Sequence, residues 1–193
     1  MIKKLSFLII PLLYIFCIST SVNVSVKEQQ VNKVEEYYQT VKQNEEIKSK
    51  LVEHVAKHIP KNSKVDPEIV VDLCIKYEFD IPLLMSQAKV ESNWGTLGRA
   101  VKTNSVFGVG AYDDGTSKYY DDVNDSIEPY IKLVKYNYLV NKSVDKLLTN
   151  YVNVKGKRYA SNTEYEVAVK RNRNKIINNS EIYNLQRELY TNI

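Results

Sequence analysis

The sequence predicts a mainly α-helical fold with one short β-hairpin or loop lobe. Apolar residues recur at helical spacing over most of the chain, and several of these stretches begin with an Asp or Ser suited to a helix N-cap. The range 103–122 departs from this pattern because it gathers Gly and Asp residues, including Asp114-Gly115, which suit a tight turn. With 193 residues, 44% of them hydrophobic, the chain can form one domain of ordinary size plus an appendage.

The N-terminus has the features of an export signal. Lys3 and Lys4 precede a long apolar run, and small residues up to Ser21 then suit a cleavage site. We expect residues 1–21 to be a signal peptide, and the alternative is an uncleaved signal anchor that extends to about residue 26. Either form predicts an exported protein of the periplasm, cell envelope or extracellular space, with membrane contact only through such an anchor.

The range 22–63 is polar, lacks glycine and predicts a helix. Its apolar residues mostly follow at spacings of three and four, which is typical of an amphipathic helix: Val31, Val34, Tyr38, Val41, Ile47, Leu51 and Val55. We expect this segment to be a stalk between membrane and domain, or a helix packed on the back of the domain. The range 64–193 is then expected to form the compact domain.

The expected helices of this domain begin at residues that favour helix N-termini. Asp66-Pro67 and Asp80-Ile-Pro82 each combine an N-cap Asp with a Pro in the first turn, and Asp125-Ser126 suggests a later cap. The expected helical ranges are 66–77, 80–92, 125–138, 143–152, 163–178 and 180–190.

Composition argues against several functional classes. The net charge of +4 is small and dispersed, so we expect no nucleic-acid partner. Cys17 lies in the N-terminal apolar run and Cys74 in a helical pattern, which implies no disulfide framework. His54 and His58 are four residues apart but lack the Glu of zinc-protease helices. We therefore expect no metal and no cofactor.

Glu91 has the surroundings that suit acid catalysis. Within the expected helix 80–92, Leu84, Ala88 and Glu91 fall on one face, and Trp94 follows closely. A carboxyl group at the end of an apolar face is partly desolvated, which raises its pKa and keeps it protonated for general acid catalysis. From spacing alone, Glu91 also fits a helix-end residue beside a core Trp.

Four ordered elements carry a resemblance to a known enzyme family. They are Ser86-Gln-Ala-Lys-Val-Glu91-Ser-Asn-Trp94-Gly95, Asn104-Ser-Val-Phe107-Gly108, Tyr119-Tyr-Asp-Asp-Val-Asn-Asp125-Ser-Ile127, and Arg158-Tyr159-Ala160-Ser-Asn followed by Tyr165. Their order is similar to that of bacterial and phage peptidoglycan glucosaminidases, glycoside hydrolase family 73, over about residues 64–190. The resemblance implies an α+β lysozyme-like fold, in which the helical domain and its lobe flank a substrate groove.

The resemblance also implies roles for the matched residues. Glu91 resembles the proton donor of the family, and Tyr159 resembles its catalytic tyrosine, which stabilises developing charge near the scissile bond. Trp94 is either a sugar platform or a core anchor. The implied substrate-binding residues are Asn104, Phe107, Gly108, Trp94 and Tyr112.

The sequence departs from the family at the second carboxylate. Many members have a second Glu in the lobe, whereas the span 109–118 contains only Asp113 and Asp114 as carboxylates. These two are the candidate second carboxylates, although Asp at a hairpin tip is commonly a turn former. An inverting glycosidase needs such a group to activate water. Two other routes stay open. The 2-acetamido oxygen of the substrate attacks the anomeric carbon in one, and a hydroxyl of the sugar attacks it in the other, as in single-glutamate lytic transglycosylases.

We therefore expect an exported peptidoglycan glycosidase of the endo-β-N-acetylglucosaminidase type that binds glycan strands. A lytic transglycosylase or muramidase on the same scaffold is the second hypothesis. The third is a wall-binding module of a virion or secretion apparatus whose catalysis has decayed.

Overall fold

The computed structural model describes residues 24–110 and 116–192, which are mainly helical, as the sequence predicts. The chain divides into two units, Met1–Val41 and Lys42–Ile193. The expected signal sequence and the expected Asp114-Gly115 turn lie outside the described residues. Among the helices of the described part, none has the length and apolar character needed to cross a membrane.

Helix α1, Val24–Ala56, belongs partly to each unit. In the first unit its apolar side chains are exposed, namely Val31, Val34, Tyr38 and Val41. In the second unit its apolar side chains Ile47, Leu51 and Val55 are buried in the hydrophobic core. The compact unit therefore begins inside the range 22–63 and includes the last turns of α1.

Helices α2, Pro67–Lys76, and α3, Ile81–Ser92, begin where the sequence predicts. The carboxylate of Asp66 accepts a hydrogen bond from the N–H of Glu68, and the carboxylate of Asp80 accepts one from the N–H of Leu83. Each Asp thereby satisfies a backbone donor that the helix itself leaves unpaired.

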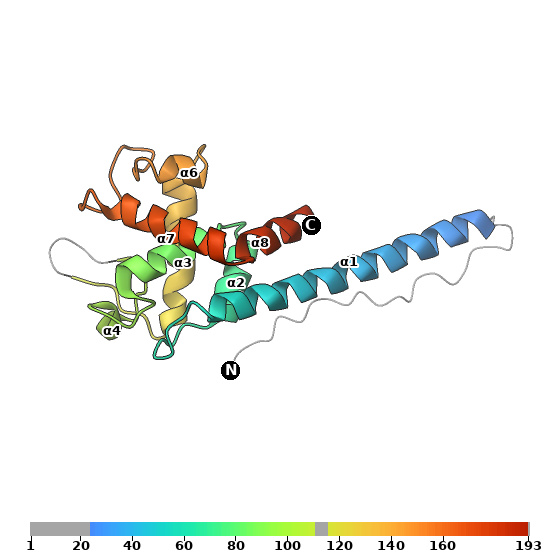
Figure 1. Ribbon diagram of the computed structural model, residues 1–193, viewed down its shortest axis with the longest axis horizontal. Coiled ribbons are helices and arrows are strands. Elements are labelled where there is room, and N and C mark those ends of the chain that lie inside the picture. The colour runs from blue at the N-terminus through green and yellow to red at the C-terminus, as the bar shows by residue number, and fades with distance from the viewer. Residues whose placement is uncertain (1–23, 111–115, 193) are drawn as a thin grey trace. The chain divides into compact units, whose positions relative to one another are not determined.

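Helix α3 is the central helix of the domain. Every residue from Ile81 to Ala88 is buried, including the polar Ser86 and Gln87. The sequence analysis placed one apolar face on this helix, whereas the structure buries most of it on all sides, as in a core helix. It packs against α7, Tyr165–Asn179, and against α8, Ile182–Thr191 (Figure 1).

The expected helix over 125–138 is interrupted. The chain forms the 3₁₀ helix η1, Val123–Ser126, then α5, Ile127–Leu133, and then the π-helical turn η2, Val134–Tyr138. Asp122 is the N-cap of η1, and Asp125 accepts a hydrogen bond from the N–H of Asp122 in a reciprocal capping box. The predicted cap at Asp125-Ser126 is therefore wrong, because Asp125 supplies the second half of a cap that begins at Asp122.

The remaining helices vary in their agreement with the expected ranges. Helix α6, Val144–Leu147, begins near the expected start, with Ser143 as its N-cap, but is shorter than the expected 143–152. The short helix α4, Ala100–Thr103, was not predicted. In the described residues no strand forms, and an isolated antiparallel bridge joins Val152 and Arg158.

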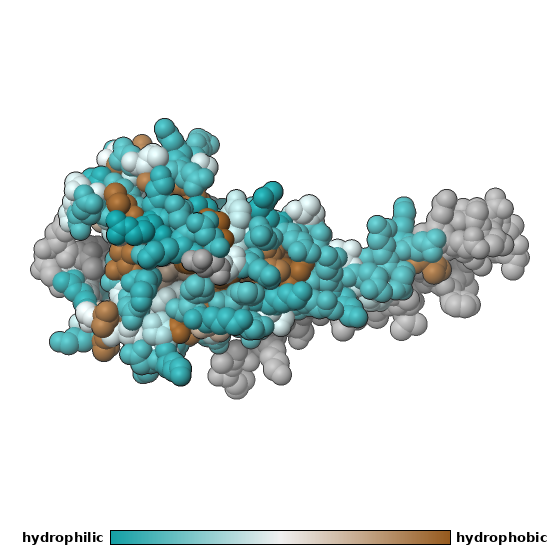
Figure 2. All heavy atoms as spheres, in the orientation of Figure 1, coloured by the Kyte–Doolittle hydropathy of each residue, from teal (hydrophilic) through white to brown (hydrophobic). Residues whose placement is uncertain are grey.

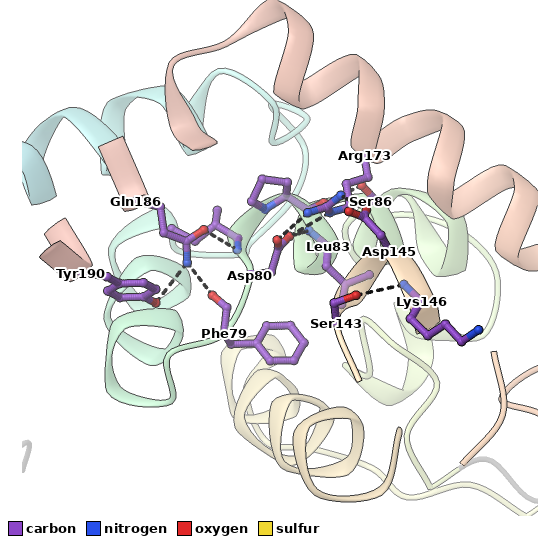
Figure 3. Close-up of polar contacts among 12 residues, drawn as sticks. Phe79, Asp80, Leu83, Ser86, Ser143, Asp145, Lys146, Arg173, Gln186 and Tyr190 are labelled. Atoms are coloured by element: carbon purple, nitrogen blue, oxygen red, sulfur yellow. Dashed lines mark hydrogen bonds and ion pairs between the residues drawn. The ribbon is translucent and has the colours of Figure 1, made fainter. Parts of the chain in front are cut away.

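A largely buried ion pair fastens the start of α3 to α7. The guanidinium of Arg173 donates to both carboxylate oxygens of Asp80, at 3.2 and 2.8 Å, and to Asp145 at 3.0 Å (Figure 3). Arg173 is only 6% exposed. The Asp80 carboxylate therefore combines a helix cap with a charge-assisted, two-point contact to a neighbouring helix.

Gln186 of α8 holds the backbone just before α3. Its side chain accepts a hydrogen bond from the N–H of Ile81 at 3.0 Å and donates to the carbonyl oxygen of Phe79 at 2.6 Å (Figure 3). These contacts use backbone groups that burial would otherwise leave unpaired. The face of the molecule seen in Figure 2 is mostly hydrophilic, with isolated hydrophobic side chains.

We expect Arg173→Met to lower the free energy of unfolding by about 3 kcal/mol, because it leaves the Asp80 carboxylate without its partner in a poorly hydrated place. Urea denaturation followed by circular dichroism measures this loss. Arg171→Met is the matched control on the same helix, since Arg171 is exposed, and it should cost less than about 0.5 kcal/mol. Equal losses in the two variants would contradict the role of the ion pair.

Candidate active site

Glu91 lies in the last turn of α3, where the buried helix reaches the surface. Burial raises the pKa of this carboxyl group, and a hydrogen bond from Tyr165 lowers it in part. The Tyr165 hydroxyl donates to Glu91 Oε1 at 2.5 Å. The other oxygen, Oε2, faces Gly108, where an added Cβ would lie 3.9 Å from it. The two carboxyl oxygens therefore have different surroundings.

Gln87 sets the direction of the hydrogen bond between Tyr165 and Glu91. It lies one turn before Glu91 on α3 and is fully buried. Its Nε2 donates to Tyr165 Oη at 2.7 Å, and its Oε1 accepts from Tyr151 at 2.7 Å and from Tyr130. Because two phenols donate to Oε1, the amide keeps its NH₂ group toward Tyr165. Tyr165 therefore accepts from Gln87 and uses its own proton for Glu91.

Stacked tyrosine rings enclose this network. Tyr159 stacks on Tyr151 with ring centroids 4.9 Å apart, and on Tyr165 with centroids 5.4 Å apart. The hydroxyl of Tyr159 donates to the backbone carbonyl of Phe107 at 3.4 Å. Burial raises the pKa of each tyrosine hydroxyl in this cluster well above the usual value for tyrosine. These hydroxyls therefore stay protonated and act as hydrogen-bond donors. The cluster consists of Tyr130, Tyr151, Tyr159 and Tyr165.

A pocket of about 200 Å³ opens beside Glu91. Its wall includes Arg99, Gly108, Ser117 and Lys118. Among the described residues that line it, Glu91 is the one carboxylate. The pocket therefore combines one acid of raised pKa with basic and hydroxyl side chains.

Gly108 is the predicted groove residue that borders this pocket directly. Its φ of +64° lies in the left-handed region, which favours glycine, and the missing side chain leaves Glu91 Oε2 accessible. The Phe107 ring, in contrast, is buried and stacks on Tyr130 with centroids 3.7 Å apart. Phe107 thus contributes its backbone carbonyl near the site while its ring belongs to the core.

The other predicted substrate-binding residues have different positions. Trp94 is 2% exposed, so its ring is a core anchor and presents no face as a sugar platform. The Asn104 side chain donates to the backbone carbonyls of Tyr120 and Asp121, at 2.9 and 3.3 Å, and thereby holds the chain that returns from the lobe. Tyr112, Asp113 and Asp114 lie outside the described residues, so their roles stay predictions.

Sequence reasoning assigned no role to Gln87, Tyr130 and Tyr151, and treated Tyr165 only as a family landmark. The spacing of Gln87 and Glu91 was an available signal, because residues four apart share one face of a helix. The tyrosines come from separate segments of the chain, so spacing carries no sign of their convergence. Within residues 24–110 and 116–192, no group of three His, Cys, Asp or Glu side chains is placed to hold a metal ion.

Comparison with known families identifies the family to which the domain around this site belongs. The Glucosaminidase family model, described as mannosyl-glycoprotein endo-β-N-acetylglucosaminidase, matches residues 67–184, which is more than half of the chain. The chain belongs to this glucosaminidase family. It is therefore a glycoside hydrolase that acts on peptidoglycan, and the resemblance inferred from the four sequence elements is confirmed. A search of curated proteins finds no match to the chain.

We expect Tyr165→Phe to raise the pKa of Glu91. The substitution removes the hydrogen bond that lowers this pKa and leaves the effect of burial. Titration of the Glu91 carboxyl by ¹³C NMR measures the change. Tyr190→Phe is the control, since it removes a hydroxyl bonded to the carbonyl oxygen of Cys74 at 3.0 Å, away from Glu91. A Glu91 pKa that is the same in wild type and Tyr165→Phe would refute the predicted effect.

Proposed function

We propose that the protein is an endo-β-N-acetylglucosaminidase that cleaves peptidoglycan glycan strands with Glu91 as the general acid. The observation that carries this proposal is the position of Glu91, which borders the pocket while burial raises its pKa. A general acid must hold its proton at the working pH and release it in the transition state. Burial favours the protonated form of Glu91, and the hydrogen bond from Tyr165 supports the carboxylate after the proton has left.

The hydrogen-bond directions favour Oε2 as the oxygen that carries the transferable proton. Tyr165 donates to Oε1, so that oxygen acts as an acceptor. Oε2 faces Gly108 at the pocket wall. When the proton passes from Oε2 to the glycosidic oxygen, the C–O bond breaks and Glu91 becomes a carboxylate. The Tyr165 hydrogen bond then strengthens, because it stabilises the charged form more than the neutral form.

Tyr159 is proposed as the helper of this step. Its ring lies on the ring of Tyr165, and its hydroxyl donates to the carbonyl of Phe107, the residue before Gly108, at 3.4 Å. Burial raises the pKa of Tyr159 well above its usual value, so its hydroxyl keeps the proton that it would donate toward charge developing on the sugar.

Three routes complete the reaction, and they give different products. Water activated by Asp113 or Asp114 would invert the anomeric centre, whereas attack by the 2-acetamido oxygen would retain it. Attack by a hydroxyl of muramic acid would leave an anhydro end, as in a lytic transglycosylase. The presence of Glu91 as the one carboxylate among the described pocket residues keeps this second candidate function in view.

We also propose that the chain is exported, through the signal peptide over 1–21 or a retained anchor. Its substrate supports this proposal, since peptidoglycan lies outside the cytoplasmic membrane.

We expect Glu91→Gln to lower kcat by at least about 100-fold, because the amide keeps the shape of the side chain but cannot donate the acid proton. Release of reducing ends from purified peptidoglycan measures the rate, with Glu53→Gln on the exposed face of α1 as control. Mass spectrometry of the products then separates reducing N-acetylglucosamine, reducing N-acetylmuramic acid and anhydro-muramic ends.

Two outcomes would count against the proposal. If Glu91→Gln is as active as the wild type, Glu91 is not the acid. If the wild type releases nothing but sediments with cell walls, the wall-binding module is the correct hypothesis.

The pH dependence provides an independent prediction. Activity requires protonated Glu91, so kcat/KM falls as the pH rises through the pKa of Glu91. Because Tyr165→Phe raises this pKa, the alkaline limb of the profile should move to higher pH in that variant. A limb that stays in place while the NMR pKa of Glu91 rises would show that another group controls it.

A further inference from the structure

Two basic side chains line the same pocket as Glu91. Arg99 and Lys118 are both exposed and both belong to its wall. Two other arginines of the domain pair with carboxylates, namely Arg158 with Glu166 at 2.8 Å and Arg173 with Asp80 at 2.8 Å. Within the described part of the chain, no ion pair involves Arg99 or Lys118. In the described part of the pocket, Glu91 is the one carboxylate that accompanies these two charges.

The fold places both side chains at this wall. Arg99 directly precedes α4, and its Nη1 donates to the Ser117 hydroxyl at 3.1 Å. The N–H of Lys118 donates to the carbonyl of Gly110 at 2.8 Å, and its ammonium lies 4.8 Å from the centre of the Tyr120 ring. The guanidinium of Arg99 is thus held by the Ser117 side chain, and the ammonium of Lys118 lies over the Tyr120 ring.

The residue at position 110 has to be glycine for this arrangement. Gly110 has a φ of +84°, and an added Cβ would lie 2.6 Å from the Cβ of Lys118. Such a distance is far below van der Waals contact, so any side chain at 110 would push the Lys118 backbone away. The close approach of Gly110 and Lys118 thus holds the second cation at the pocket.

We propose that Arg99 and Lys118 form a subsite for carboxylates carried by the muramic acid residues of the substrate. This inference rests on the proposed function, since it assigns the substrate groups bound in the pocket of Glu91. The sugar rings of an N-acetylated peptidoglycan strand are neutral, and its negative charges lie on the lactyl and peptide substituents of muramic acid. A guanidinium and an ammonium from residues that line one pocket match such a carboxylate in charge and hydrogen bonding.

Glu91 shares the pocket with the two cations, and burial favours the neutral form of this carboxyl group by raising its pKa. A pocket of about 200 Å³ also brings the cations within reach of a substituent on a sugar held near Glu91. The subsite therefore distinguishes peptidoglycan from glycans of the same linkage that carry no carboxylate.

The test compares native strands with strands whose charge has been removed. The full chain with Glu91→Gln keeps the glycan intact, and fluorescence anisotropy of end-labelled strands measures Kd. Native soluble peptidoglycan is compared with the same strands after carbodiimide coupling of methylamine, which converts the carboxylates to neutral amides. We expect native strands to bind about fivefold more tightly, with the difference shrinking as salt is added.

Replacing both cations should abolish this preference. With Arg99→Met and Lys118→Met added, native and amidated strands should bind with the same Kd. The matched control adds Lys61→Met and Lys64→Met, which remove the same charge from exposed positions outside the pocket, and it should keep the preference. Strands stripped of stem peptides, which expose the lactyl carboxylate, show which of the two carboxylate sources is bound.

The inference is overturned if the Arg99 and Lys118 variant keeps the parent ratio of Kd values, or if it weakens binding to both preparations equally. Turnover by the wild type is measured separately on the native strands. Absence of turnover counts against the proposed function. For the subsite, the deciding result is whether the Arg99 and Lys118 variant loses the preference for native strands, which supports the subsite, or keeps it, which contradicts the subsite.

Discussion

The position of α3 against α7 is the constraint on which the rest of the structure depends. The two helices run antiparallel and are joined at both ends by different interactions. At the start of α3, Asp80 pairs with the largely buried Arg173. At its other end, Gln87 and Glu91 both contact the hydroxyl of Tyr165. Because α3 is buried on most sides, these contacts set both its place in the core and the depth at which Glu91 emerges.

Each buried polar group around Glu91 has a hydrogen-bond partner, and the partners fix which group donates and which accepts. Gln87 is surrounded by apolar and aromatic side chains, where an unpaired amide would be costly. Tyr130 and Tyr151 satisfy its oxygen, and its NH₂ group turns to Tyr165. The same contacts that stabilise the core therefore orient the donor to the catalytic candidate. Burial and hydrogen bonding act in opposite directions on the pKa of Glu91, which suits a group that must hold and then release a proton.

The pocket combines features that a neutral sugar polymer with acidic substituents requires. Gly108 leaves Glu91 Oε2 accessible, and the basic residues Arg99 and Lys118 line the same pocket. In the proposed mechanism the acid acts on the sugar linkage, whereas the cations bind the carboxylates of the substituents. The two proposals thus assign bond cleavage and recognition to different side chains of one pocket.

Local interactions are what the sequence by itself determined. Asp66 and Asp80 start their helices through contacts within the next three residues, so their effect is visible in a short window. The motif around Glu91 likewise identified the family, and with it the substrate. Only the tertiary structure decided that Tyr165 contacts both Gln87 and Glu91, because α7 comes from a distant part of the chain and is brought to α3 by helix packing. The burial of Trp94 was likewise decided only by the tertiary structure, because its exposure depends on how the neighbouring elements pack and not on the residues next to it in sequence.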